Sequence, residues 1–316
     1  MSAFALTVTF VFSLVGLGYF SGLSGLLKAE VGAALTDFVM VIALPILLFR
    51  MMVTAEFGSV APWSLWLTYF TAIAASWVVG QFVTASVFGR DRRASIIGGL
   101  ASSFSNLVLL GLPFCLSLFG QAGASILLLV IAVHLPVMMA VSVILFALVG
   151  RDAKGRIEPG REIRGFLVAL ATNHLVVGIL LGLGWRITGL ALPQLAWRII
   201  ETFADIAGPL ALFAMGLGLR RFGISGNLGP ALVLSALKLG FMPLVALSMA
   251  LLLDLPPLTA KIAVLGASMP TGVNPYLFAM RFGTGQALSS NTLSIATLAA
   301  VFTTFGWLAV VQALFG

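Results

Sequence analysis

The chain has 316 residues, of which 60% are hydrophobic and 9% are charged, with a mean hydropathy of +1.15 and a formal net charge of +7. Soluble domains carry about 25% charged residues. The composition therefore excludes a soluble globular protein and indicates a chain that lives in a lipid bilayer. The positive charge does not indicate a nucleic-acid partner, because the basic residues form no clustered face and membrane topology explains their distribution.

A membrane-spanning helix needs roughly 20 apolar residues. The apolar run from Phe4 to Phe20 follows no charged region and precedes no obvious cleavage site, so we expect a first membrane helix rather than a secretory signal. Nine further segments are long and apolar enough to form membrane-spanning helices. The predicted fold class is therefore an all-α membrane protein whose ten transmembrane helices cover approximately 2–20, 32–54, 62–88, 93–119, 122–150, 164–190, 195–219, 228–253, 258–281 and 286–314.

The positions of Lys and Arg predict the orientation, because cytoplasmic loops carry an excess of these residues. If the N-terminus faces outward, twelve basic residues lie inside and four lie outside. The twelve are Lys28, Arg90, Arg92, Arg93, Arg151, Lys154, Arg156, Arg161, Arg164, Arg220, Arg221 and Arg281, and the four are Arg50, Arg186, Arg198 and Lys261. We therefore expect both termini outside.

Two apolar segments contain breaks rich in proline and glycine, at 105–113 and 268–276. In a bilayer such residues free backbone groups, which are tolerated only where protein or a water-filled cavity satisfies them. A pair of interrupted segments in corresponding positions of two halves is the best sequence indication of a transporter binding site. The two breaks are therefore the first candidate for a functional site.

The spacing of prolines indicates an internal repeat. Pro45 lies 68 residues before Pro113, and Pro209 lies 66 residues before Pro275. Chance similarity among apolar helices is the alternative explanation. Because each half holds five predicted helices, the second half must enter the membrane in the opposite orientation. We expect a first five-helix repeat at 1–150, a cytoplasmic linker at 151–163 and a second, inverted repeat at 164–316.

Three motifs in these regions are Phe38-Val39-x4-Leu44-Pro45-x2-Leu48-Phe49, Asn106-x4-Gly111-x-Pro113 and Met269-Pro270-x-Gly272-x2-Pro275-x2-Phe278-Ala279. They resemble the auxin efflux carrier family, which includes plant auxin exporters and bacterial carriers described for malonate or other organic acids. The resemblance implies a ten-helix fold related to bile-acid symporters and sodium/proton antiporters, with helices 4 and 9 broken and crossing. It also implies that helices 1, 2, 6 and 7 form a scaffold against which the other six move.

The predicted substrate site combines amide side chains with helix ends. An amide offers hydrogen-bond donors and an acceptor without charge, and the N-terminal ends of broken helices favour anions. Alternatively, the amides of Asn106 and Asn274 only satisfy the backbone groups that the breaks free. The candidate substrate-binding residues are Asn106, Gly111, Pro113, Pro270, Gly272, Asn274, Pro275 and Tyr276.

The candidate coupling residues are Lys238, Asp205 and His174, because each could exchange a proton within the membrane. A lysine at the centre of a membrane helix costs ~2.5–3.5 kcal/mol on insertion scales. Lys238 is therefore expected either to have a partner or a cavity, or to extend its amine to the headgroups. The ordinary role of a lone membrane histidine is a hydrogen bond to a neighbouring helix, and we expect it for His134 and His174.

These features predict a secondary active transporter or uniporter that moves a small organic anion, a mono- or dicarboxylate, by elevator-type alternating access. The alternatives are a sodium- or proton-coupled symporter of another organic solute and a channel, which would need a polar stripe or charged rings along a pore. An enzyme, a cofactor and a metal site are not expected, because the sequence carries none of their motifs. The expected partners are the organic anion and the lipid bilayer of a bacterial inner membrane; proton coupling and a homodimer stay open.

Overall fold

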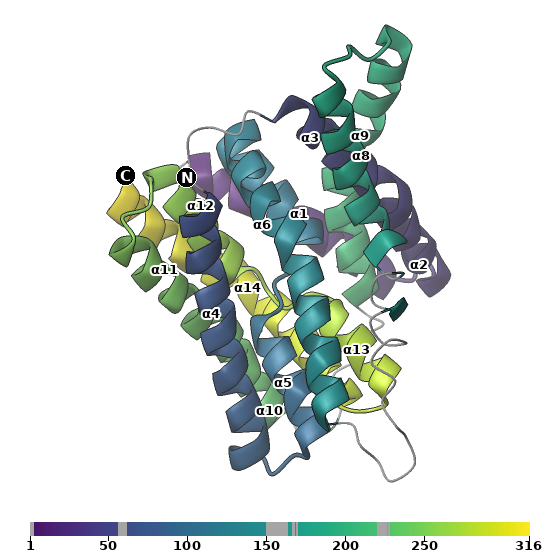
Figure 1. The fold of residues 1–316 in the computed structure, drawn as a ribbon. Coiled ribbons are helices and arrows are strands. Elements are labelled where there is room, and N and C mark those ends of the chain that lie inside the picture. The colour runs from purple at the N-terminus through teal and green to yellow at the C-terminus, as the bar shows by residue number, and fades with distance from the viewer. Residues whose placement is uncertain are drawn as a thin grey trace. The chain divides into compact units, whose positions relative to one another are not determined.

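The computed structural model describes residues 3–55, 62–149, 164, 165, 168, 170–219, 226 and 228–316. Over these residues the chain is helical, and its one strand-like pairing is an isolated antiparallel bridge between Ser105 and Thr271 (Figure 1). The prediction of an all-α protein is confirmed. The linker expected at 151–163 lies outside the described residues.

The helices follow the apolar segments of the sequence. Their bounds are α1 Ala3–Leu23, α2 Ala29–Phe38, α3 Leu44–Thr54, α4 Pro62–Phe82, α5 Arg92–Ser103, α6 Leu112–Val149, α8 His174–Thr188, α9 Gln194–Gly218, α10 Gly229–Ala236, α11 Met242–Leu252, α12 Pro257–Ser268, α13 Asn274–Phe282 and α14 Gln286–Phe315. In the described part of the chain, seven helical stretches are long and apolar enough to cross a membrane. The shorter α8 is also apolar.

Short π-helical turns interrupt several of these helices, and some of them end two residues before a proline. The turn η1 (Val39–Ala43) precedes Pro45, and η5 (Leu237–Phe241) precedes Pro243. Proline has no N–H group and its ring crowds the carbonyl four residues earlier, so the helix must open there. In η5 the carbonyl of Leu239, which cannot receive an N–H from Pro243 four residues later, accepts a hydrogen bond of 2.7 Å from Nε1 of Trp307.

The long helix α6 changes direction at Gly120. This residue has φ 61° and ψ −156°, a conformation that costs glycine little and other residues much. The kink falls between the fourth and fifth segments expected from the sequence. A further π-helical turn, η3 (Leu107–Gly111), leads into the start of this helix.

The helices form two compact units, and each draws on both halves of the sequence. The first unit contains α1, α2, α3, α8, α9 and the chain from Val108 to Ala132. Within it, α1 packs on α9, and α3 packs on α8 and α9. Helices α1 and α9 touch closely at Gly216, where an added Cβ would overlap the carbonyl oxygen of Val15. Small residues at such positions let membrane helices approach each other.

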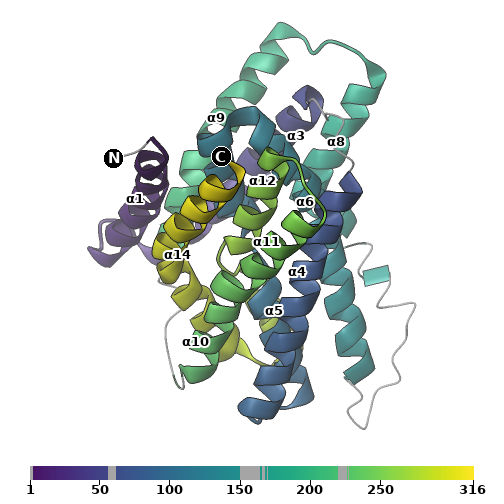
Figure 2. The same ribbon diagram turned by 90° about the vertical axis from the view of Figure 1, so that its left-hand side faces the viewer.

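The second unit contains α4, α5, the rest of α6 and α10 to α14. Helix α4 lies beside α5 and α11, which the two views of the ribbon also show (Figures 1 and 2). Ser76 of α4 and Ser102 of α5 join the helices reciprocally, because each hydroxyl donates to the other residue's carbonyl, at 2.7 and 2.9 Å. Buried hydroxyls paired in this way act as glue between apolar helices.

Candidate functional site

The two breaks predicted from the sequence meet in the second unit and pair with each other through their main chains. Helix α5 ends at Ser103 and α12 ends at Ser268, and an extended segment follows each. The N–H of Asn106 donates to the carbonyl of Pro270 at 2.8 Å, and the N–H of Gly272 donates to the carbonyl of Phe104 at 3.0 Å. The two interrupted helices are therefore joined by a short antiparallel ladder.

A side chain adds a third bond between the breaks. The Thr271 hydroxyl donates to the carbonyl of Ala101, in the last turn of α5, at 2.6 Å. Carbonyls in the last turn of a helix have no partner within the helix. The backbone groups joined by these three bonds are satisfied by main-chain partners and by the Thr271 hydroxyl.

Gly272 permits this close pairing. A Cβ added at Gly272 would lie 3.3 Å from Cδ1 of Phe104 and 3.6 Å from Cα of Asn106. Contacts of that length leave no room for a larger side chain unless the Phe104 ring moves. Asn106, Pro270 and Gly272, three of the predicted site residues, are therefore brought together by the fold, and the side chain of Asn106 is 9% exposed.

The other predicted substrate residues lie on either side of this ladder in the sequence. Asn274 is the first residue of α13, followed by Pro275 and Tyr276, and both Asn274 and Tyr276 are half-buried. A proline in the first helical turn costs no hydrogen bond, which explains why α13 begins there. Such a start presents N–H groups and the positive end of the helix dipole, which together favour an anion.

Gly111 and Pro113 belong to the first unit. Gly111 ends η3, and Pro113 is the second residue of α6. There Pro113 contacts α9, because a Cβ added at Gly208 would lie 3.6 Å from Cβ of Pro113. In this unit Pro113 therefore has a packing role, beside the role in substrate binding that the sequence suggests.

Lys238 lies in η5 and is completely buried. Its Nζ donates a hydrogen bond of 2.6 Å to the carbonyl oxygen of Ala267, in the last turn of α12. A cation is stabilised at this end of a helix, where the dipole is negative and the carbonyls lack partners. The idea that Lys238 extends its amine to the headgroups is wrong, because this hydrogen bond holds the amine inside the second unit.

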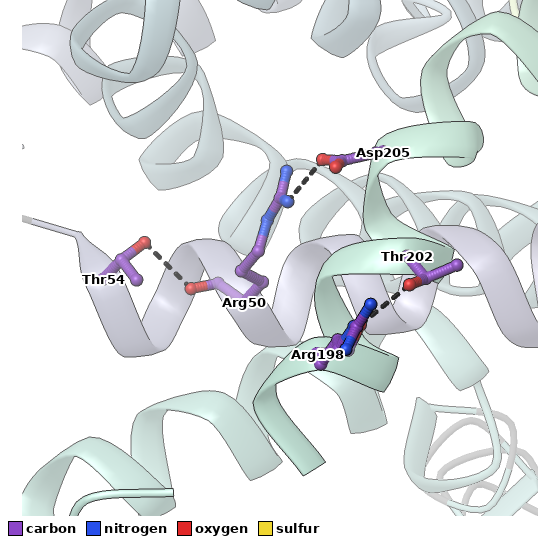
Figure 3. Close-up of polar contacts among 5 residues, drawn as sticks. All are labelled: Arg50, Thr54, Arg198, Thr202 and Asp205. Carbon is purple, nitrogen blue, oxygen red and sulfur yellow. Dashed lines mark hydrogen bonds and ion pairs between the residues drawn. The ribbon is translucent and has the colours of Figure 1, made fainter. Parts of the chain in front are cut away.

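Asp205, the second coupling candidate, lies in α9 and pairs with Arg50 of α3 (Figure 3). Nη1 of Arg50 lies 2.6 Å from Oδ1 of Asp205, and the side chains are 12% and 69% exposed. The sequence analysis placed Arg50 at the outer end of its segment and left Asp205 without a partner. The pair ties two helices of the first unit together. It cannot be found from the sequence, because its members are 155 residues apart.

His174, the third coupling candidate, is the first residue of α8 and is exposed. Its neighbour Asn173 caps the helix, because the side-chain oxygen of Asn173 accepts from the N–H groups of Leu175 and Val176. His174 is therefore an exposed residue at the start of a helix.

Two buried polar side chains near the first break, His134 and Tyr69, are not among the site residues predicted from the sequence. His134 of α6 lies edge-on against Phe104 and Tyr69, with ring centroids 4.7 and 5.7 Å apart. The hydrogen bond expected for His134 is wrong, because neither ring nitrogen has a partner among the described residues. Tyr69 itself is completely buried in α4. Aromatic residues in apolar helices carry no sequence signal that would single these out.

Among the described residues, no group of three or more His, Cys, Asp or Glu side chains could hold a metal ion. The polar groups at the breaks are instead backbone amides and carbonyls, hydroxyls, two amide side chains, one imidazole and one ammonium. Most of these can donate hydrogen bonds, and the ammonium is the only charge among them. The arrangement is suited to holding an anion rather than to performing a covalent reaction.

Comparison with known proteins agrees with this chemistry. Residues 3–308 match the profile of a family described as "Membrane transport protein". A protein of Rhizobium meliloti (strain 1021), described as "Putative malonate transporter", is 24% identical over 308 residues, which cover 95% of this chain and 93% of that protein. Because the family match spans nearly all of the sequence, the chain belongs to the membrane transport protein family, the family of the auxin efflux carriers, and is an integral membrane protein.

Proposed function

We propose that this membrane transporter is a secondary carrier or uniporter for a small organic anion, which binds beside the paired breaks of α5 and α12. The observation that carries the proposal is the completely buried ammonium of Lys238, bonded to the last turn of α12. A buried charge without a partner of opposite charge is costly. The described acidic side chains of the second unit are Asp91, which caps α5, and Asp254, which follows α11. A substrate carboxylate would supply the missing negative charge.

Two further features support an anionic substrate. The start of α13, with Asn274 in its first turn, offers N–H donors and a positive dipole end. The related Rhizobium protein is described as "Putative malonate transporter", which makes malonate the first compound to test here. Asn106 would complete the site, since it joins the two breaks through its main chain and carries an amide that can donate to a carboxylate.

The proposed mechanism is an elevator in a fold of ten helices, arranged as two inverted repeats at 1–150 and 164–316. The division of the helices into units supports this. The first unit gathers the segments expected for helices 1, 2, 6 and 7 of the scaffold, which are α1, α2 with α3, α8 and α9. It also includes the chain from Val108 to Ala132, which belongs to the expected helices 4 and 5 and departs from that scheme. The second unit holds both α5 and α12, so the paired breaks and Lys238 would move together with the bound anion.

Lys238 would also set the charge balance of the cycle. Moving one elementary charge through the membrane potential is worth ~2.3 kcal/mol per 100 mV. A monoanion bound to a lysine ammonium crosses as a neutral pair, whereas a dianion such as malonate crosses with a net charge of −1. A proton taken up or released by the amine would change that balance. Efflux or uniport of an anion needs no coupling cation, whereas accumulation of a dianion would need at least two. We place the protein in a bacterial inner membrane, with both of its termini on the outer side. A homodimer is compatible with this orientation.

The experiment that tests the proposal is binding to the purified protein followed by transport. Thermal unfolding in detergent would be measured against acetate, malonate, succinate and citrate, with neutral malonamide as the control. A compound that binds only the folded state raises the melting temperature by mass action. The proposal expects at least one carboxylate, and not malonamide, to raise it and to be taken up by proteoliposomes. If no carboxylate is bound or transported, the proposed function is wrong.

A further inference from the structure

A group of buried polar side chains surrounds the ring of His134, beside the first break. Tyr69 comes from α4, Ser105 from the extended segment after α5, His134 from α6 and Lys238 from η5. All four are buried and belong to the second unit. They are separated by up to 169 positions in the sequence, so only the fold brings them together.

The contacts place His134 at the centre of this group. Its ring lies edge-on to Tyr69 on one side and to Phe104, the residue before Ser105, on the other. Lys238 approaches the same region from the second break, because its Nζ donates to the carbonyl of Ala267, three residues before Pro270, whose carbonyl bonds Asn106. The hydroxyls of Tyr69 and Ser105 are both buried, and neither has a hydrogen-bond partner among the described residues.

The group has donors that lack acceptors. Among the described residues, neither ring nitrogen of His134 has a hydrogen-bond partner, nor do the Tyr69 and Ser105 hydroxyls. The three N–H bonds of the Lys238 ammonium have one recorded acceptor, the carbonyl of Ala267. Native proteins satisfy most buried polar groups, so a concentration of unused donors requires an explanation.

An anion suits these unpartnered groups better than a metal cation does. A carboxylate only accepts hydrogen bonds, and it offers about four lone-pair sites on two oxygens. The tyrosine hydroxyl, the N–H of the imidazole and the ammonium can all donate to it, and the ammonium also supplies the opposite charge. A metal cation would be repelled by Lys238 and would find no carboxylate in the group.

We propose that Tyr69, His134 and Lys238 form a carboxylate-binding subsite beside the first break, and that His134 and Tyr69 determine which anions the transporter accepts. The inference rests on the proposed function, because it assigns these residues to the substrate of the same site. The Phe104 ring lies against His134, so the anion would enter as this ring moves aside. The Phe104 ring contacts the position where Gly272 would carry a side chain, and through it the subsite connects to both breaks.

The test uses variants that remove donors and keep shape. Tyr69→Phe removes one hydroxyl, and His134→Phe keeps an aromatic ring but removes both nitrogens. Tyr19→Phe is the matched control, because Tyr19 lies in α1 of the first unit and also loses only a hydroxyl. His134→Gln restores an N–H donor. Each purified full-length variant is titrated with acetate, malonate, succinate and citrate, and the unliganded melting temperature reports its folding.

We expect Tyr69→Phe and His134→Phe to bind the best carboxylate about 10- to 100-fold more weakly, as for lost hydrogen bonds to a charged ligand. Tyr19→Phe should bind it as the parent does, and His134→Gln should recover part of the affinity. If His134→Phe does not fold, Tyr69→Phe and His134→Gln decide. Parent-like affinity in the variants that remove donors would overturn the subsite and leave the proposed function standing. A parent protein that binds no carboxylate overturns both.

Discussion

The ammonium of Lys238 donates a hydrogen bond to the carbonyl oxygen of Ala267, across 2.6 Å in the interior of the second unit. This contact ties the helix that carries the buried charge to the helix that ends at the second break. A compact lysine ammonium satisfies a helix C-terminus well, because it combines a hydrogen bond with a favourable charge. Because this hydrogen bond lies beside the second break, we expect an anion bound at the break to interact with the charge of Lys238.

A first prediction concerns this lysine. Lys238→Gln keeps a donor for the carbonyl of Ala267 and removes the charge, so the carrier should lose the pH dependence of net transport, or lose net transport while exchange survives. Transport into proteoliposomes is measured across a range of pH, with and without internal substrate. The pH series reports the pH dependence, and the comparison with and without internal substrate separates exchange from net transport. A pH profile that overlays that of the parent would assign Lys238 a structural role and leave Asp205 and His174 as the candidates for proton coupling.

Asn106→Ala tests the amide at the first break. The main-chain bond from Asn106 to Pro270 does not depend on the side chain, so folding should persist. Losing a hydrogen bond to a charged ligand costs about 1.5–3 kcal/mol, which corresponds to roughly a 10- to 100-fold weaker affinity. Titration calorimetry on purified protein checks this. Normal expression with unchanged affinity would make Asn106 a purely structural residue.

Gly216→Ala tests the packing of α1 on α9. The added methyl group would overlap the carbonyl of Val15, and overpacking of this kind costs typically ~1–3 kcal/mol. The melting temperature in detergent should fall. Gly184→Ala is the matched control, since Gly184 lies in α8 with no heavy atom near the added Cβ. Equal melting temperatures for both variants would show that α1 and α9 do not pack as described.

Topology can be tested by labelling single cysteines. In a Cys115→Ala background, Gly316→Cys should react with a membrane-impermeant maleimide in intact cells, and Lys154→Cys should react only after permeabilisation. The excess of basic residues on one side is the physical reason, because it sets the orientation during insertion. Labelling of both cysteines from the same side would contradict the inverted repeat.

Several features of this molecule follow from local sequence alone. The breaks near Pro270 and Asn106 could be predicted because proline and glycine disrupt helices wherever they occur. The kink at Gly120 also lies between two expected segments, because glycine readily adopts the non-helical conformation found there. Helix positions were predictable because bilayer thickness fixes the length of an apolar segment, and this requirement does not depend on tertiary contacts.

The site itself could be predicted only in part. Sequence reasoning found Lys238 because a charge in an apolar segment stands out, but not its acceptor, the carbonyl of Ala267, since any backbone carbonyl could serve. Tyr69 stayed unassigned, and His134 was expected only to bond a neighbouring helix, because the surroundings of both rings depend on packing. The bond between Thr271 and Ala101 joins residues 170 positions apart, and only packing selects such partners.

The most direct test of the central claim is a counterflow measurement with the parent protein in proteoliposomes. Vesicles are loaded with an excess of the best-binding unlabelled carboxylate and diluted into a trace of the same compound carrying a label. A carrier whose site faces one side at a time should accumulate label transiently above its external concentration, and empty vesicles should not. Label entry that is unaffected by internal substrate and does not saturate would contradict the account, because it would indicate a channel.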